Sequence, residues 1–106
     1  MEDKSQLDTR QFGAAINTGV TLVDLNVPWC RPCRVQEPII KKIAKRFEGK
    51  ATIIEINVDD NRETAAGLCI RSIPTLIIYK DGREIRRLFG IQSEQSLTQA
   101  IENVLG

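Results

Sequence analysis

Apolar residues along the chain follow two spacings, which predict strands and helices in alternation. Short runs rich in β-branched and aromatic residues are typical of strands, and they span residues 20–27, 52–58, 75–79 and 84–89. Apolar residues three and four positions apart predict a helix over residues 35–47 and a last helix that starts near Ser93. A short first helix capped by Thr9, and a turn with a short helix over residues 59–68, complete the pattern.

The order of these elements limits the fold to a small set. The strand–helix–strand unit over residues 20–58 requires a parallel pair of strands with a right-handed crossover. The turn over residues 80–83 joins the last two strands as an antiparallel hairpin. The sequence therefore predicts an α/β fold with a mixed central β-sheet flanked by helices on both faces. At 106 residues the chain has the length of a single domain, spanning residues 1–106.

The composition gives no sign of a nucleic-acid or membrane partner. The 15 Lys and Arg residues balance 14 Asp and Glu residues, so the net charge of +1 lacks the basic footprint typical of nucleic-acid binding. No apolar run approaches the roughly 18 residues that a membrane span needs. The segment Met1–Lys4 is acidic where a secretory signal would be basic and then apolar, so we expect a cytoplasmic protein.

The chain has no histidine, which removes several classes of site. Cys–His and Ser–His nucleophiles and histidine-ligated metal ions are excluded. Three cysteines remain, at positions 30, 33 and 69. A structural zinc site normally needs four Cys or His ligands, and an iron–sulfur cluster needs four thiolates. One chain supplies neither, although a dimer could share a site, so we expect no metal and no bound cofactor.

Cys30 and Cys33 stand at the predicted start of a helix. Pro28 ends the strand before them, and Pro32 suits the first helical turn, which tolerates a missing N–H donor. At a helix N-terminus, unpaired N–H groups and the positive end of the helix dipole favour a thiolate at Cys30. Two thiols one turn apart can close a disulfide with little backbone movement. The pair therefore suits thiol–disulfide exchange better than a permanent crosslink.

Two other interpretations of the pair stay open at this point. The cysteines could form half of an intermolecular zinc site, which needs a partner chain. They could also be two unrelated buried cysteines, although Trp29, Arg31 and Pro32 make this segment a poor piece of core. The setting favours redox exchange, because the Cys-x-x-Cys sequence follows a buried strand and opens a helix.

At these residues the chain resembles the thioredoxin family, and the similarity covers nearly its whole length. The matching elements are Asp24 in the strand before the motif, Trp29-Cys30-x-Pro32-Cys33, Pro38, Ile73-Pro74-Thr75, Gly82 and Gly90. The resemblance implies a thioredoxin fold in which Cys30 attacks a substrate disulfide and Cys33 resolves the mixed disulfide. It also implies a substrate-binding surface made of Trp29, Arg31, Pro32, Ile73, Pro74 and Gly90.

Two residues outside the cysteine motif take on roles through the resemblance. Asp24 interrupts an apolar strand, and the family pattern has this position accept and return the proton of Cys33. We expect burial to raise the pKa of Asp24; the alternative is a solvent-facing strand residue. Pro74 matches the family's cis-proline, which would present the backbone of Ile73 to an extended substrate. The alternative is an ordinary trans bond.

The chain departs from the family pattern close to the motif. Arg31 stands where the family usually has glycine, and we hypothesise that it stabilises the Cys30 thiolate and makes the protein more oxidising. The alternative is that solvent screening removes this effect. Asn26 stands where an aromatic residue is frequent, and Glu55 where a lysine is common. Glu55 beside Asp24 would oppose deprotonation of that acid, since like charges repel.

Cys69 is the remaining thiol, and it stands where the family pattern often has a glycine at the end of a helix. We expect a small buried or half-buried side chain, because free cysteine behaves as a small hydrophobe. The alternative is a regulatory or dimer-forming thiol near the substrate groove.

With the resemblance, the sequence predicts a protein-disulfide reductase that cycles Cys30 and Cys33 between dithiol and disulfide. Electrons would come from a separate reductase, by analogy the NADPH-linked thioredoxin reductase, and the clients would be disulfide-containing proteins. We expect a monomer. Two alternatives remain because a fold does not determine a function. One is an oxidase or isomerase that acts on folding proteins, and the other is a binding module that uses its thiols rarely.

Overall fold

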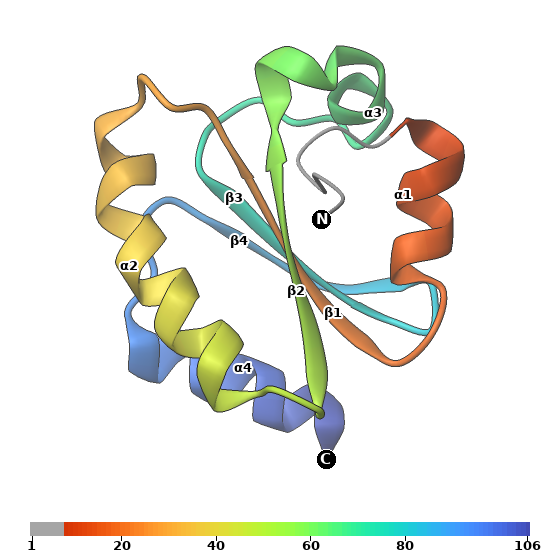
Figure 1. Cartoon of the computed structure of the whole chain (residues 1–106), viewed down its shortest axis with the longest axis vertical. Coiled ribbons are helices and arrows are strands. Elements are labelled where there is room, and N and C mark those ends of the chain that lie inside the picture. Colours follow the sequence, from red (N-terminus) through yellow and green to blue (C-terminus); the bar gives the residue numbers. More distant parts are fainter. Residues whose placement is uncertain (1–7) are drawn as a thin grey trace.

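The computed structural model describes residues 8–106, and its centre is a four-stranded mixed sheet in the order β2-β1-β3-β4 (Figure 1). The strands are β1 (Val20–Asn26), β2 (Ala51–Asn57), β3 (Thr75–Lys80) and β4 (Arg83–Phe89). β1 runs parallel to β2 and antiparallel to β3, and β3 runs antiparallel to β4. The helices are α1 (Thr9–Ile16), α2 (Arg31–Arg46), α3 (Arg62–Gly67) and α4 (Glu94–Leu105), with a 3-10 turn η1 (Val58–Asp60). The predicted order of elements and the mixed sheet are confirmed.

Helices cover both faces of the sheet, as the sequence predicts: α2 and α4 lie on one face, and α1 and α3 on the other (Figure 1). Under α2 and α4, the core contains Val20, Leu22, Ile40, Ile43, Phe47, Leu76, Ile78, Leu88, Leu97, Ala100 and Ile101. Under α1 and α3, it contains Phe12, Ile16, Val23, Leu25, Ile54, Ile56, Ile77 and Tyr79. Because side chains alternate along a strand, Asp24 lies on the same face of β1 as Leu22, which is the face that α2 covers.

The cap of α1 differs from the prediction. Asp8, and not Thr9, is the N-terminal cap, and Thr9 is the first helical residue. The Asp8 carboxylate accepts a hydrogen bond from the backbone N–H of Gln11 at 2.7 Å, and the Gln11 side chain accepts from the N–H of Asp8 at 2.9 Å. This reciprocal pair satisfies two backbone donors at the start of the helix, which a cap one residue later would leave unpaired.

Two predictions of burial are also wrong in part. The apolar run over residues 52–58 predicts a buried strand, but only Ile54 and Ile56 of β2 are buried, because β2 lies at the edge of the sheet. In α2 the apolar spacing predicts that Val35 faces the core, whereas Val35 is exposed and its neighbour Gln36 is buried. Hydrogen bonds of the Gln36 amide to the backbone of Gln92 account for this difference.

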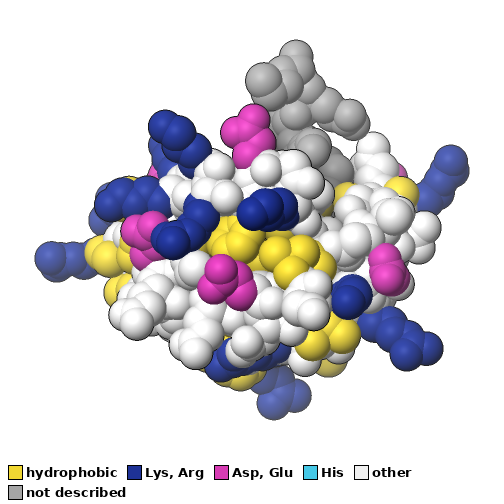
Figure 2. All heavy atoms as spheres, turned by 90° about the horizontal axis from the view of Figure 1, so that it is seen from below, with side chains coloured by type: hydrophobic (Ala, Val, Ile, Leu, Met, Phe, Trp, Pro, Cys, Tyr) yellow, Lys and Arg dark blue, Asp and Glu magenta, His cyan; other side chains and the backbone are white. Residues whose placement is uncertain are grey.

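The outer surface mixes charges of both signs. Figure 2 shows the end of the molecule that carries the C-terminus, with Lys and Arg around its rim, Asp and Glu among them, and a small hydrophobic area at the centre. Within residues 8–106, no helix is long and apolar enough to span a membrane. The acidic segment Met1–Lys4, on which the expected localisation depends, lies outside the described residues.

Candidate active site

Cys30 lies where a buried strand gives way to a helix, as predicted. β1 ends at Asn26, and Cys30 is the N-terminal cap of α2 with extended backbone angles. Its Sγ accepts a hydrogen bond from the backbone N–H of Cys33 at 3.3 Å. Pro32 occupies the first turn, where no backbone donor is needed. A sulfur at this position faces the positive end of the helix dipole, which favours an anion.

The two cysteines are free thiols, and both are buried. They form a small apolar cluster with Val27, against which Val58 and Ile73 pack. Burial raises the pKa of the Cys33 thiol, and the hydrogen bond to Cys30 raises it further. Cys33 therefore holds its proton when the pair is reduced, and it needs a nearby base before it can act as a nucleophile.

Asp24 is the nearest candidate for that base. Its side chain is 1% exposed, so the solvent-facing alternative is wrong. One carboxylate oxygen accepts a hydrogen bond from the Asn26 side-chain amide at 3.1 Å, and the other has no hydrogen-bond partner among residues 8–106. Burial raises the pKa of Asp24 to about 7, the Asn26 hydrogen bond opposes that rise, and the negative charges of Glu55 and Glu37 add to it. An acid with a pKa near neutrality can both accept and return a proton.

Glu55 lies beside Asp24 because the two residues pair in the parallel register of β1 and β2. A cavity of about 310 Å³ opens next to them and is bordered by Asn26, Cys33, Glu37 and Glu55. It provides room for water between Cys33 and the residues around the buried acid. Partial burial and the charge of Glu37 raise the pKa of Glu55 as well.

Pro74 and Gly90 border the cysteines on the other side. The Ile73–Pro74 peptide bond is cis, as the resemblance implies, so the trans alternative is wrong. The Cys30 Sγ lies 4.0 Å from the carbonyl oxygen of Ile73. Gly90 has a φ of +75°, which favours glycine, and its N–H donates to the carbonyl of Pro74 at 3.0 Å. Ile73, Pro74 and Gly90 are thus held together beside Cys30.

Large apolar side chains are exposed around this site. Trp29 is 68% exposed, and its Nε1 donates to the Asp59 carboxylate at 2.9 Å, which fixes the ring next to Cys30. Phe89 and Ile91 flank Gly90 and are also exposed. Arg31 extends into solvent from the first turn of α2. The structure therefore brings together all of the sequence-predicted site residues around one end of α2.

Several site residues were missed by the sequence analysis. Asp59 and Ile91 gave no signal, and Phe89 was assigned only to a strand. Asn26 was noted as a departure from the family pattern, but its hydrogen bond to Asp24 was not foreseen. The one available signal was spacing, because residues two apart on a strand lie on the same face.

Cys69 lies elsewhere in the sequence and in a different environment. It is exposed, which contradicts the expected buried or half-buried thiol. Its φ of +58° is the left-handed conformation in which helices commonly end, and that backbone turns the side chain outward from the end of α3. The regulatory or dimer-forming role stays a prediction.

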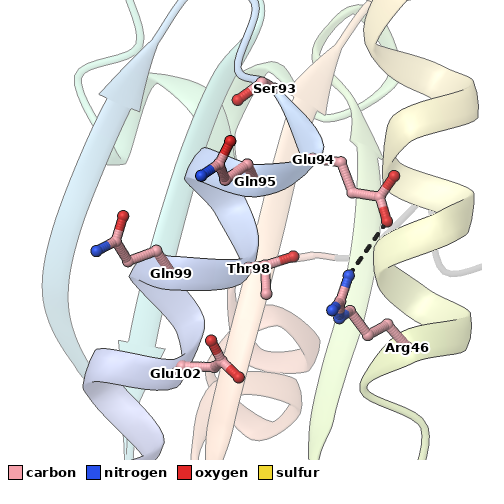
Figure 3. Close-up of a pocket in the computed structure, with 7 residues that line it drawn as sticks. All are labelled: Arg46, Ser93, Glu94, Gln95, Thr98, Gln99 and Glu102. Atoms are coloured by element: carbon pink, nitrogen blue, oxygen red, sulfur yellow. Dashed lines mark hydrogen bonds and ion pairs between the residues drawn. The ribbon is translucent and has the colours of Figure 1, made fainter.

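A larger hollow, of about 660 Å³, lies between the end of α2 and the start of α4 (Figure 3). Its side chains are polar, and an ion pair between Arg46 and Glu94 at 3.4 Å crosses it. It is lined by no cysteine. Within residues 8–106, no group of three or more His, Cys, Asp or Glu side chains could hold a metal ion.

The chain is similar to known thioredoxins over most of its length. The thioredoxin family model matches residues 3–103. Thioredoxin from Staphylococcus aureus is 38% identical over 94 residues, which cover 89% of this chain and 90% of that protein. Thioredoxin from Staphylococcus saprophyticus is 40% identical over the same shares.

Solved structures show the same fold. A mutant thioredoxin from Halobacterium salinarum has a TM-score of 0.84 at 26% identity and covers 100% of this chain and 96% of its own. Mitochondrial thioredoxin 3 from Saccharomyces cerevisiae, in its oxidised form, has a TM-score of 0.83 at 22% identity, over 91% of this chain and 90% of its own. With a cysteine pair at the start of α2 and these relatives, the chain belongs to the thioredoxin family and is a thiol–disulfide oxidoreductase.

Proposed function

We propose that this protein reduces disulfide bonds in client proteins, with Cys30 as the nucleophile and Cys33 as the resolving thiol. The observation that supports this best is the hydrogen bond from the Cys33 N–H to the Cys30 Sγ at the N-terminus of α2. The donor and the helix dipole both favour a thiolate at Cys30, and the thiolate is the attacking form in disulfide exchange.

The proposed reaction transfers two electrons in two exchange steps. The Cys30 thiolate attacks one sulfur of the client disulfide; the client S–S bond breaks, a Cys30–client disulfide forms, and the other client sulfur leaves as a thiolate. Cys33 then loses its proton and attacks the Cys30 sulfur, which releases the second client thiolate and closes the Cys30–Cys33 disulfide. The client thiolates take up two protons, so the client is reduced and the pair is oxidised.

Asp24 is the proposed acceptor of the Cys33 proton. Its pKa of about 7 suits proton exchange at neutral pH, and its unpartnered oxygen leaves room for a further hydrogen bond. The cavity bordered by Asn26, Cys33 and Glu55 supports a route through water. When the pair is reduced again, the same carboxyl group would return the proton to Cys33.

The proposed client surface consists of the exposed Trp29 and the segment Ile73–Pro74 with Gly90, and it includes Arg31 and Pro32. An extended client strand would pair with the backbone of Ile73, in the manner of strand addition. The proposed electron donor is a thioredoxin reductase-like enzyme, since the pair must be returned to the dithiol after each cycle. We further propose that the protein works as a monomer in the cytoplasm, without a bound cofactor.

Reduction of insulin by dithiothreitol tests the function, because the expected outcome is faster precipitation of insulin when the native chain is present. Cys30→Ser is expected to abolish this acceleration. Cys33→Ser, reduced and then freed of dithiothreitol before insulin is added, is expected to accumulate a Cys30–insulin disulfide that mass spectrometry detects. Cys69→Ser is the matched control and is expected to keep full activity. Turnover that survives in Cys30→Ser contradicts the proposal. Negligible turnover of the native chain contradicts it too, and a chain that only oxidises or rearranges disulfides identifies an oxidase or isomerase.

A thioredoxin reductase with NADPH, supplied in place of dithiothreitol, tests the proposed donor. NADPH oxidation that depends on the chain supports it, and oxidation at the background rate with each reductase tested contradicts it.

A further inference from the structure

Gln36 is a polar residue of α2 whose side chain is 0% exposed. Its amide oxygen accepts a hydrogen bond from the Gln92 backbone N–H at 2.7 Å, and its amide nitrogen donates to the Gln92 carbonyl at 3.0 Å. The Gln36 side chain thus binds both the N–H and the carbonyl of Gln92, a residue that lies outside the sheet and has no strand partner for either group. Buried polar groups are retained where they are paired in this way.

These two hydrogen bonds join α2, the helix that carries both cysteines, to the segment 89–92. Gln36 lies one helical turn beyond Cys33, and Gln92 lies two residues beyond Gly90. The Gly90 N–H is bound to the carbonyl of Pro74 at 3.0 Å, so the segment is held at two points. One point is the Pro74 loop beside Cys30, and the other is the helix that carries both cysteines.

Between these two points the segment exposes apolar side chains. Phe89 is 61% exposed although its backbone pairs with Thr75 in the sheet, and Ile91 is 48% exposed although it lies between the bound backbones of Gly90 and Gln92. The side chain of Gln92 adds local bonds, since its Nε2 donates to the carbonyl of Phe89 at 2.9 Å. Exposed apolar side chains on a held backbone are suited to contact with another protein, because little conformational entropy is lost when they bind.

We propose that Gln36 is a positioning residue for client recognition. It holds the exposed segment Phe89–Ile91 at a fixed position relative to Cys30, so that a client bound to this segment presents its disulfide to the Cys30 sulfur. This inference rests on the proposed reduction of client disulfides. Both hydrogen bonds of the Gln36 side chain go to the backbone of Gln92 and neither involves a cysteine sulfur, so we expect an effect on binding of a protein substrate and not on the chemistry of the cysteines.

Two kinds of substrate separate this role from a general structural one. A protein disulfide has apolar neighbours that contact the segment, whereas a small aromatic disulfide reaches Cys30 without them. Gln36→Met keeps the length of the side chain and removes both hydrogen bonds. Gln92→Ala is the matched control, because it keeps the backbone groups bound to Gln36 and removes only the local side-chain bonds.

The expected result for Gln36→Met is a KM for insulin that rises about tenfold, since a loosened segment must be ordered again on binding. Its kcat, its rate with the small disulfide and its midpoint potential are expected to stay within about twofold of the native values, because no contact to Cys30 or Cys33 changes. Gln92→Ala is expected to raise the KM for insulin less than Gln36→Met does.

An unchanged KM for insulin overturns the proposal, and so does an equal loss with insulin and with the small disulfide. If Gln36→Met does not fold, hydrogen exchange in the native chain decides. The Gln92 amide hydrogen is then expected to exchange at least about 100-fold more slowly than that of Ile91, and equal rates overturn the proposal. A native chain that fails to reduce insulin contradicts the proposed function itself, whereas an active native chain with an unaffected Gln36→Met variant overturns only the role of Gln36.

Discussion

The cysteine pair has an inner side, which faces the core beneath α2, and an outer side, which faces solvent. The two sides differ in how strongly a charged group interacts with its neighbours. On the inner side, Asp24 lies beneath α2 with one hydrogen bond, and burial raises its pKa to about 7. On the outer side, Arg31 and Trp29 stand in water, where a charge is screened. We therefore expect the inner side to control the proton and the outer side to serve recognition. Variants taken from the inside outward test this contrast, and the largest effects are expected on the inner side.

Asp24→Asn is expected to have the largest effect, on stability as a function of pH. The pKa of Asp24 is about 7 in the folded chain and 3.8 as a free side chain. Between these values the folded state keeps a proton that the unfolded state releases, so the contribution of Asp24 to stability is highest at low pH and falls as the pH rises to 7. At 1.36 kcal/mol per unit the loss is about 4 kcal/mol by pH 8. Asp24→Asn has no carboxyl group at this position, so it is expected not to lose this stability as the pH rises.

Urea unfolding at pH 4 and pH 8 measures the effect. The free energy of unfolding of Asp24→Asn, minus that of the native chain, is expected to grow by about 4 kcal/mol between the two pH values. Asp60→Asn, at an exposed acid, is the control and is expected to follow the native curve. Parallel curves for native chain and Asp24→Asn would show that Asp24 titrates as an ordinary surface acid.

Asn26→Leu is expected to have the next largest effect. The Asn26 amide donates to the Asp24 carboxylate and stabilises its charged form, so its loss raises the pKa of Asp24 above 7. A hydrogen bond to a charged group contributes about 1.5–3 kcal/mol, and the lower value suits the half-buried Asn26. That value corresponds to about a tenfold smaller acid dissociation constant. NMR titration of the Asp24 carboxyl carbon measures it, and a titration midpoint equal to the native one contradicts it.

The sequence was sufficient to predict the inner side of the site because its signals are local. Asp24 interrupts an apolar run, and a polar residue in such a run is buried on one face of the strand or the other. Cys30 follows a strand that Pro28 ends, and the helix therefore begins beside it. Both inferences need only the residues within one element and its neighbours, and both are confirmed.

The rest could not be predicted because it depends on residues far apart in the chain. Gln36 is buried where Gln92, 56 residues later, supplies two backbone partners, whereas the apolar Val35 beside it is exposed. The edge position of β2 depends on the order of the strands, which the apolar pattern does not encode. Cys69 is exposed because of its left-handed backbone angle, which residue type alone does not reveal.

Glu55→Gln is expected to have a smaller effect of opposite sign to that of Asn26→Leu. Glu55 pairs with Asp24 across β1 and β2, and its charge raises the pKa of Asp24. Glu55 is exposed on its outer side, so the interaction is partly screened and contributes on the order of 0.5 kcal/mol. The acid dissociation constant of Asp24 is then expected to rise about twofold. The same NMR titration measures the change, and its disappearance in 1 M salt would identify it as electrostatic. A pKa of Asp24 that rises in the variant contradicts the prediction.

Arg31→Gly is expected to have a small effect, similar in free energy to that of Glu55→Gln, on the midpoint potential. Two unit charges about 6 Å apart in water interact by about 0.7 kcal/mol, and Arg31 is exposed next to the Cys30 sulfur. On the hypothesis that Arg31 stabilises the Cys30 thiolate and with it the reduced pair, the native chain is expected to be more oxidising than the variant. For a two-electron couple, 0.7 kcal/mol corresponds to about 15 mV, so the variant is expected to have a midpoint lower by that amount. Equilibration with glutathione at low and high salt measures both midpoints. Because solvent screens charges on the outer side, the difference in midpoint potential is expected to vanish at high salt. A difference that persists at high salt would show that the charge of Arg31 is not screened by solvent.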